Sequence, residues 1–239
     1  MRRRIRPKKP LSNPPASPAV IRRWKRWLEP MQSDLYDLYG RKEIFWDLQE
    51  IAQENPRILE VGSFFDWMCR NYITAQAVSV RRFLDQDRNS HSLWRLLYEL
   101  LEHPKSITRA DHVKMYRTTP IGESLGQMSF NSVVGKRRTH LGAAAIRSDL
   151  KRLEDASDRI RRLVNKRIAH FTRQGSIRKL PRLNDLDSAL EVVDKLFHKY
   201  DLLLTGRGGD TSHATRQYDW REALWEPWVP KGSRFRPDA

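Results

Sequence analysis

The sequence has one cysteine, Cys69, and lacks any apolar run near the roughly 18 residues that a membrane-spanning helix needs. A single cysteine excludes an intrachain disulfide and a cysteine-based metal site. The N-terminus is basic, as in a secretory signal, but no apolar segment follows it. We therefore expect a disordered basic arm over residues 1–18 and a cytoplasmic protein with no membrane partner.

The sequence also lacks internal repeats and the alternating apolar and polar residues that are typical of strands. Almost every patterned segment has helical period instead, which predicts an all-α bundle of long antiparallel helices. We expect a helical domain over residues 19–205, followed by a tail over residues 206–239 that packs on the bundle. The expected helices span residues 19–38 with a break at Pro30, then 41–54, 64–84, 92–102, 108–117, 141–172 and 186–204.

Residues 118–140 carry Gly, Ser, Thr and basic residues without an apolar stripe, which predicts a long loop. The tail beyond residue 206 concentrates three of the eight tryptophans, Trp220, Trp225 and Trp228. These tryptophans either cover an apolar groove of the bundle or form a segment that binds a partner or stacks on bases. The sequence leaves both interpretations open.

Acidic residues are too few to balance the basic ones, and the net charge is +16. Of the 45 basic residues 32 are arginine, which is suited to bidentate contact with phosphate. Six basic residues lie in the first ten, but without them the remainder still carries about +10. The charge favours RNA or a nucleotide as the binding partner. The alternative interpretation is that the basic residues only keep the protein soluble.

One histidine, His170, lies in the basic segment "NKRIAHF" near the end of the expected helix over residues 141–172. With about 100° per residue, His170 falls on the polar side of this helix, at the margin of an arginine-rich ridge. Neighbouring cations favour a neutral imidazole, which can accept a proton. Alternatively, His170 is an ordinary solvated histidine on a polar helix face. The ridge and its surroundings comprise Arg159, Arg161, Arg162, Asn165, Lys166, Arg167 and Arg173.

The segment "IRSDLKRLEDASDRIRRLVNKRIAHF" resembles the signature helix of HEPN domains, particularly the abortive-infection type-U-like branch. Upstream, "AVSVRRFLDQDRNSHSLWRLLYELLEHP" is similar to the same branch, in which a helix ends at Arg-x-x-x-Asp before a Ser-Leu-x-x-Leu-Leu helix. The resemblance covers residues 64–204. It implies an all-α bundle and a homodimer whose signature helices face each other across a cleft. Many such proteins are metal-independent endoribonucleases of toxin or phage-defence type, and others only bind RNA or nucleotides.

The family's motif has an arginine, usually a polar residue next, and then a histidine after four to six intervening residues. Asn165 and His170 match the last two positions, but residues 163–165 hold no arginine. We expect Arg162 and Lys166, with Arg167 as a further candidate, to contact the phosphate in its place. Arg159, Arg161 and Arg173 are candidate nucleic-acid contacts.

Three functions follow as hypotheses: an endoribonuclease with His170 as base and a neutralising antitoxin partner, a non-catalytic binder of nucleic acid or nucleotides, and a protein-interaction subunit that uses the tail. The sequence predicts no cofactor and no metal site, because it lacks an evident cluster of Asp, Glu and His ligands.

Overall fold

The computed structural model describes residues 14–60, 63–118, 120–168, 181–209, 218–229 and 231–235. Within these ranges the chain is helical, with no strand, and the predicted all-α fold is confirmed. The α-helices are α1 (Pro18–Glu54), α2 (Arg57–Glu60), α3 (Ser63–Arg82), α4 (Leu93–Glu102), α5 (Arg109–Lys114), α6 (Gly122–Val134), α7 (Ala143–Leu163), α8 (Leu183–Thr205) and α9 (Glu222–Trp225), and a π-helix, η1 (Val164–Ile168), continues α7.

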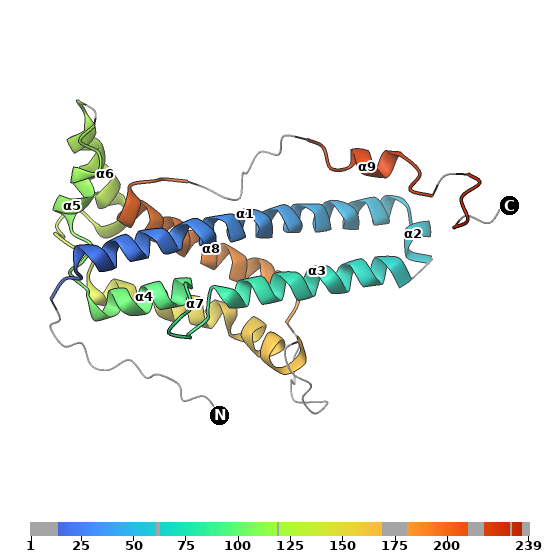
Figure 1. Cartoon of the computed structure of the whole chain (residues 1–239), viewed down its shortest axis with the longest axis horizontal. Helices are drawn as coiled ribbons and strands as arrows, with labels where there is room; N and C mark the ends of the chain where they lie inside the picture. Colours follow the sequence, from blue (N-terminus) through green and yellow to red (C-terminus); the bar gives the residue numbers. More distant parts are fainter. Residues whose placement is uncertain are drawn as a thin grey trace.

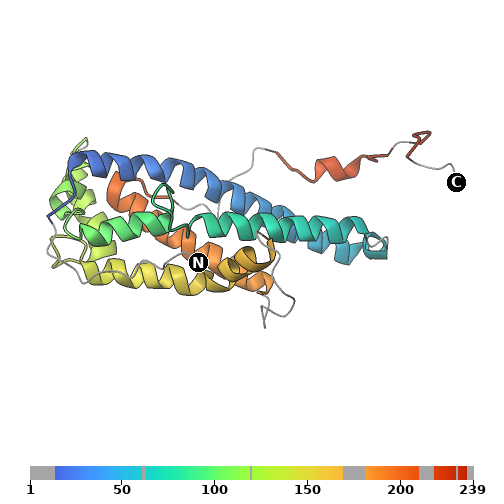
Figure 2. The same cartoon turned by 60° about the horizontal axis from the view of Figure 1, so that its bottom comes forward.

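Helices α1, α3, α4, α7 and α8 run along the long axis and pack into one bundle (Figures 1 and 2). Their apolar stripes meet in a core whose largest fully buried side chains include Trp24, Leu97, Phe197 and Tyr200. On the helix expected over residues 186–204, the apolar residues at helical spacing are all buried: Leu186, Leu190, Val193, Phe197, Tyr200 and Leu204. Tyr200 also donates a hydrogen bond to Asp149 Oδ2 at 2.8 Å, which ties α8 to α7. The helix that carries the basic ridge is therefore fixed to a packed core.

Helix α1 is continuous, so the predicted break at Pro30 is wrong. Proline in a helix interior removes one backbone hydrogen bond and usually kinks or ends the helix. Here the apolar residues on both sides of Pro30, including Leu28, Met31 and Leu35, are buried in the same core. Tertiary packing on one face thus maintains the helix across the proline.

The far halves of α1 and α3 extend beyond α7 and α8 to α2, as a two-helix arm (Figure 1). Phe45 and Tyr72 stack between the two helices with ring centroids 3.9 Å apart. Near the tip, Phe64 and Trp67 stack on each other but are more than half exposed. In the described part of the chain, no helix is both long and apolar enough to cross a bilayer.

Residues 118–140 are not the long loop that the sequence predicts, because they contain α6. This helix packs against α5 through Gly126, where a Cβ atom would lie 2.8 Å from the Cα of Val113. At its C-terminal end the Arg109 guanidinium donates hydrogen bonds to the carbonyl oxygens of Gly135, Lys136 and Arg138. A backbone contact and an arginine cap therefore stabilise α6 in place of a broad apolar stripe.

The described part of the tail touches α1 through Trp220, whose indole Nε1 donates to Asp47 Oδ2 at 3.2 Å. Trp225 and Trp228 are instead 71% and 67% exposed, and α9 has no buried residue. These two tryptophans do not fill a groove of the bundle.

Candidate nucleic-acid interface

Helix α7 presents one apolar side to the core and a basic side to the surface. Leu150, Leu153 and Ile160, which recur at helical spacing on the apolar side, are at most 6% exposed. Because these residues fix the rotation of the helix, Arg159 and Arg162 are directed outward, with side chains that are 52% and 58% exposed. The helical register derived from the sequence is thus confirmed as far as Leu163.

The arginines of this ridge are held by carboxylates. Arg161 donates a hydrogen bond to Asp158 Oδ1 at 2.6 Å, and Arg162 contacts the other oxygen of the same carboxylate. Arg159 Nη1 donates to Asp185 Oδ1 on α8 at 2.8 Å. The ridge therefore carries less free charge than its arginine count indicates.

The pKa values of these two aspartates reflect the pairing. Partial burial acts to raise the pKa of Asp158, but hydrogen bonds and charges from Arg161 and Arg162 outweigh it and hold the pKa below its usual value. The backbone N–H of Arg182 lowers the pKa of Asp185, and the nearby Arg159 lowers it further. Both carboxylates are ionised at neutral pH and stay paired with the ridge.

Beyond Leu163 the chain leaves α-helical geometry and forms the π turn η1. The prediction of an α-helix is therefore wrong over Val164–Ile168, where the assumed 100° per residue does not hold, and residues 169–172 of the expected helix lie outside the described part of the chain. A π turn closes hydrogen bonds to the fifth residue and is frequent at functional sites. It contains Asn165, Lys166 and the backbone of Arg167, whose side chain lies outside the described part of the chain.

A cation from another helix reaches this turn. Arg81, in the last turn of α3, donates a hydrogen bond from Nε to Asn165 Oδ1 at 3.1 Å, across 84 positions of sequence. Asn165 occupies the polar position of the motif. Sequence reasoning missed Arg81, although it begins the Arg-x-x-x-Asp segment, because helical spacing does not indicate which helices touch.

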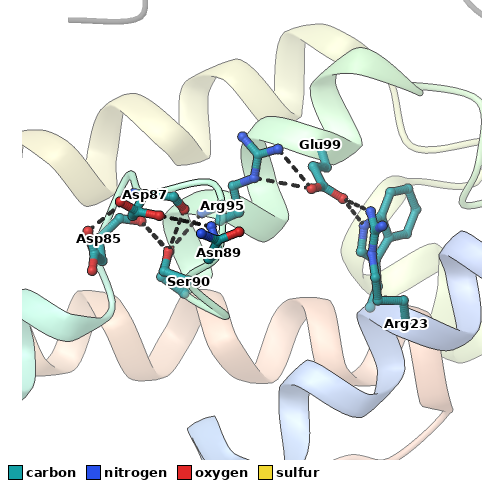
Figure 3. Close-up of polar contacts among 9 residues, drawn as sticks. Arg23, Asp85, Asp87, Asn89, Ser90, Arg95 and Glu99 are labelled. Carbon is teal, nitrogen blue, oxygen red and sulfur yellow. Dashed lines mark hydrogen bonds and ion pairs between the residues drawn. The ribbon is translucent and has the colours of Figure 1, made fainter. Parts of the chain in front are cut away.

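The turn after α3 is held rigidly at Asp85 (Figure 3). The hydroxyls of Ser90 and Ser92 donate to its carbonyl oxygen at 3.1 and 2.5 Å, and its side chain accepts from the N–H of Asp87. Asp85 Oδ2 lies 4.0 Å from Arg81 Nη1. The loop therefore fixes a carboxylate beside Arg81 without forming a close ion pair with it.

Two sequence candidates, His170 and Arg173, lie outside the described residues. Of the remaining candidates, the structure brings Arg161 and Arg162 together on Asp158, and it places Asn165 against Arg81. Among the described residues, no three His, Cys, Asp or Glu side chains gather as a metal site would require.

A pocket of about 270 Å³ lies near the same end of α3, lined by residues that include Asp34, Arg82 and His91. Its volume is at the lower limit of ordinary ligand sites. The Arg82 guanidinium is already paired with Asp34, with Nη2 3.1 Å from Oδ2. Arg81 and Arg82 are thus adjacent in sequence but have different surroundings.

Comparison with known families finds that the family model HEPN_AbiU2, described as AbiU2, matches residues 23–222. No curated protein and no solved structure matches the chain. The matched range includes α3, α7 and η1, the elements that supply the basic ridge and the contact between Arg81 and Asn165.

Proposed function

Because the chain belongs to the AbiU2 family of HEPN domains, we propose that it acts on RNA as a metal-independent endoribonuclease of toxin or phage-defence type. The observation that supports this most is the π turn at the end of α7, which carries Asn165 and Lys166 directly after the arginine ridge. A polar residue, a histidine and several cations in one segment suit the cleavage of a phosphodiester.

In the proposed reaction, His170 accepts the proton of an RNA 2′-hydroxyl. The 2′-oxygen then forms a bond to the adjacent phosphorus, the bond from phosphorus to the 5′-oxygen breaks, and this oxygen takes a proton from solvent. The products are a 2′,3′-cyclic phosphate and a 5′-hydroxyl. A placed general base contributes roughly 10²–10⁴-fold, and fixed cations stabilise the charge that develops on the phosphate.

The π turn supports Arg162 as a substitute for the motif arginine. Seven residues separate Arg162 from His170, one more than the family's motif allows. A π turn holds one residue more than an α turn, since its hydrogen bonds reach one residue further. The one extra residue that η1 holds therefore equals the one residue by which the spacing from Arg162 to His170 exceeds the motif.

We also propose that two chains pair so that their basic segments face one cleft, because one ridge per chain forms a cleft only when it is paired. Light scattering at micromolar concentration should then give the mass of a dimer. A monomer at that concentration would contradict a composite site.

The test of the enzymatic function compares RNA cleavage and growth arrest by the wild type and by His170→Ala. We expect the wild type to cut RNA and the variant to leave it intact. The matched control is His140→Ala, which removes a histidine whose Nδ1 contacts only its neighbour Thr139 among the described residues. Equal cleavage by the wild type and His170→Ala would remove His170 from the mechanism.

A non-catalytic RNA or nucleotide binder is the second candidate. The pairing of Arg159, Arg161 and Arg162 with Asp158 and Asp185 supports it, because paired arginines stabilise developing charge less effectively. A wild type that binds RNA with a steep salt dependence, yet leaves it uncut and does not arrest growth, would favour this function.

A third candidate, a protein-interaction subunit, is supported by the exposure of Trp225 and Trp228. Monomeric proteins rarely expose several large apolar side chains together without a role. Truncation after Gly209 keeps the residue that ends α8, Gly206, and removes both tryptophans. The truncated chain should stay folded and lose its protein partner in co-purification, and an unchanged complex would contradict this candidate.

A further inference from the structure

We propose that Arg81 of α3 is a phosphate-contacting residue of the RNA site, oriented by Asn165. The inference rests on the proposed function and adds a cation that lies outside the signature helix. The observation behind it is the hydrogen bond from Arg81 Nε to Asn165 Oδ1 at 3.1 Å.

The remaining donors of Arg81 are only partly engaged. Its Nη1 is 4.0 Å from Asp85 Oδ2, at the outer limit of an ion pair, and no hydrogen bond from Nη2 is found within the described residues. The side chain is 32% exposed, so solvent and a solvent-borne phosphate can reach it. A guanidinium has five N–H donors, and Arg81 uses one of them in a close contact with the described part of the chain.

The ridge arginines differ from Arg81 in the charge of the group that holds them. Arg161 and Arg162 share the carboxylate of Asp158 in close contacts, and Arg159 is bound to Asp185 at 2.8 Å. An ion pair at the surface contributes little stability, but it occupies donors and cancels charge where a phosphate would bind. The close contact of Arg81 within the described ranges is instead with the neutral amide of Asn165, and its nearest carboxylate there, Asp85, stays 4.0 Å away.

Arg81 is also held in a defined direction. Helix α3 packs against α7 and η1, and the last turn of α3 leads into the loop that Ser90 and Ser92 fix at Asp85. Asn165 accepts from Nε, on the side edge of the planar guanidinium that Nε shares with Nη2, and this contact leaves the end edge formed by Nη1 and Nη2 for a ligand. An arginine oriented in advance loses less entropy on binding than a freely rotating one, so its contact with phosphate is stronger.

The test measures single-turnover RNA cleavage by Arg81→Ala, Arg81→Lys and the matched control Arg82→Ala. Both alanine variants lower the net charge by one, so they weaken non-specific RNA attraction alike. We expect Arg81→Ala to slow cleavage about 10²-fold, as the loss of one placed donor to a developing oxyanion does. Arg82→Ala should stay within about twofold, because it removes only an exposed pair with Asp34.

Two further variants separate a phosphate contact from a purely structural role. Arg81→Lys keeps the charge but lacks the planar fork, so it should recover part of the lost rate. Asn165→Ala should slow cleavage less than Arg81→Ala, and adding it to Arg81→Ala should cost little more, because the two residues act as a unit. Thermal unfolding of all variants checks that they fold alike.

The outcomes distinguish this inference from the proposed function. If the wild type cuts RNA and His170→Ala does not, equal rates for Arg81→Ala and Arg82→Ala overturn the role of Arg81 alone. If the wild type binds RNA without cutting it, the RNA affinities of Arg81→Ala and Arg82→Ala are compared in place of their cleavage rates. Equal affinities then overturn the role of Arg81. A wild type that neither binds nor cuts RNA overturns both proposals.

Discussion

The buried carboxylate of Glu99 provides a sharp test of how the bundle is held together. It is 7% exposed and accepts hydrogen bonds from three side chains: Arg23 at 2.5 Å, Trp24 Nε1 at 2.8 Å and Arg95 at 3.1 Å (Figure 3). Arg23 and Trp24 lie on α1, so their two hydrogen bonds join α1 to α4, whereas Arg95 lies on α4 itself. Trp24 is fully buried, and replacing Glu99 with alanine removes the only acceptor that its indole has among the residues that the structure describes.

The expected loss follows from these contacts. An unsatisfied buried donor costs about 1–3 kcal/mol, and breaking a buried charge pair costs about 3–5 kcal/mol. The two costs overlap, and Arg23 is 44% exposed and can regain water. We therefore expect Glu99→Ala to lower the free energy of unfolding by about 3 kcal/mol. Glu99→Gln keeps an acceptor oxygen for Trp24 and should lose less.

The assay is denaturant unfolding at fixed pH and salt, with Glu102→Ala as the control on the same helix. Glu102 is exposed, so its replacement should change stability by no more than about 0.5 kcal/mol. A loss below 1 kcal/mol for Glu99→Ala would refute the view that this cluster couples α1 to α4.

Three further predictions concern α6, His112 and the ridge. Gly126→Ala should destabilise the fold by about 1–3 kcal/mol in denaturant unfolding, because its Cβ would meet the backbone of Val113, whereas Gly208→Ala faces open space and should be neutral. Burial lowers the pKa of His112 below 6.5, so the unfolded chain binds the proton more readily; stability should fall as the pH drops through about 6.5, and His112→Gln should flatten this fall in thermal unfolding. Asp158→Asn frees Arg161 and Arg162, so the RNA affinity measured in a filter-binding titration should rise more than for Asp155→Asn, whose partner is Lys151. Equal affinities of the two variants would show that pairing does not limit the ridge.

The helices that pack by apolar stripes could be predicted from sequence. Leu150, Leu153 and Ile160 on α7, and Leu190, Val193 and Phe197 on α8, recur at helical spacing and are all buried. Helix α6 could not be predicted this way. It depends on a close backbone approach at Gly126 and on the capping of its end by Arg109, neither of which leaves a periodic signal.

The candidate site was only partly predictable, for two physical reasons. The π turn at Val164–Ile168 has no compositional signature, so a sequence read at α-helical spacing predicts an α-helix there. The contact of Arg81 with Asn165 depends on which helices are neighbours, and spacing within one helix carries no information about that. The carboxylate that holds Arg161 and Arg162, that of Asp158, was visible in the sequence, but this pairing could be seen only in the structure.

The most direct test of the central claim identifies the ends of the RNA fragments that the wild type produces in the presence of EDTA. An attack by the 2′-hydroxyl, with His170 as base and arginine and lysine side chains on the phosphate, predicts 2′,3′-cyclic phosphate and 5′-hydroxyl ends, formed without added metal. Fragments with 5′-phosphate ends, or cleavage that stops when divalent metal is chelated, would contradict the account.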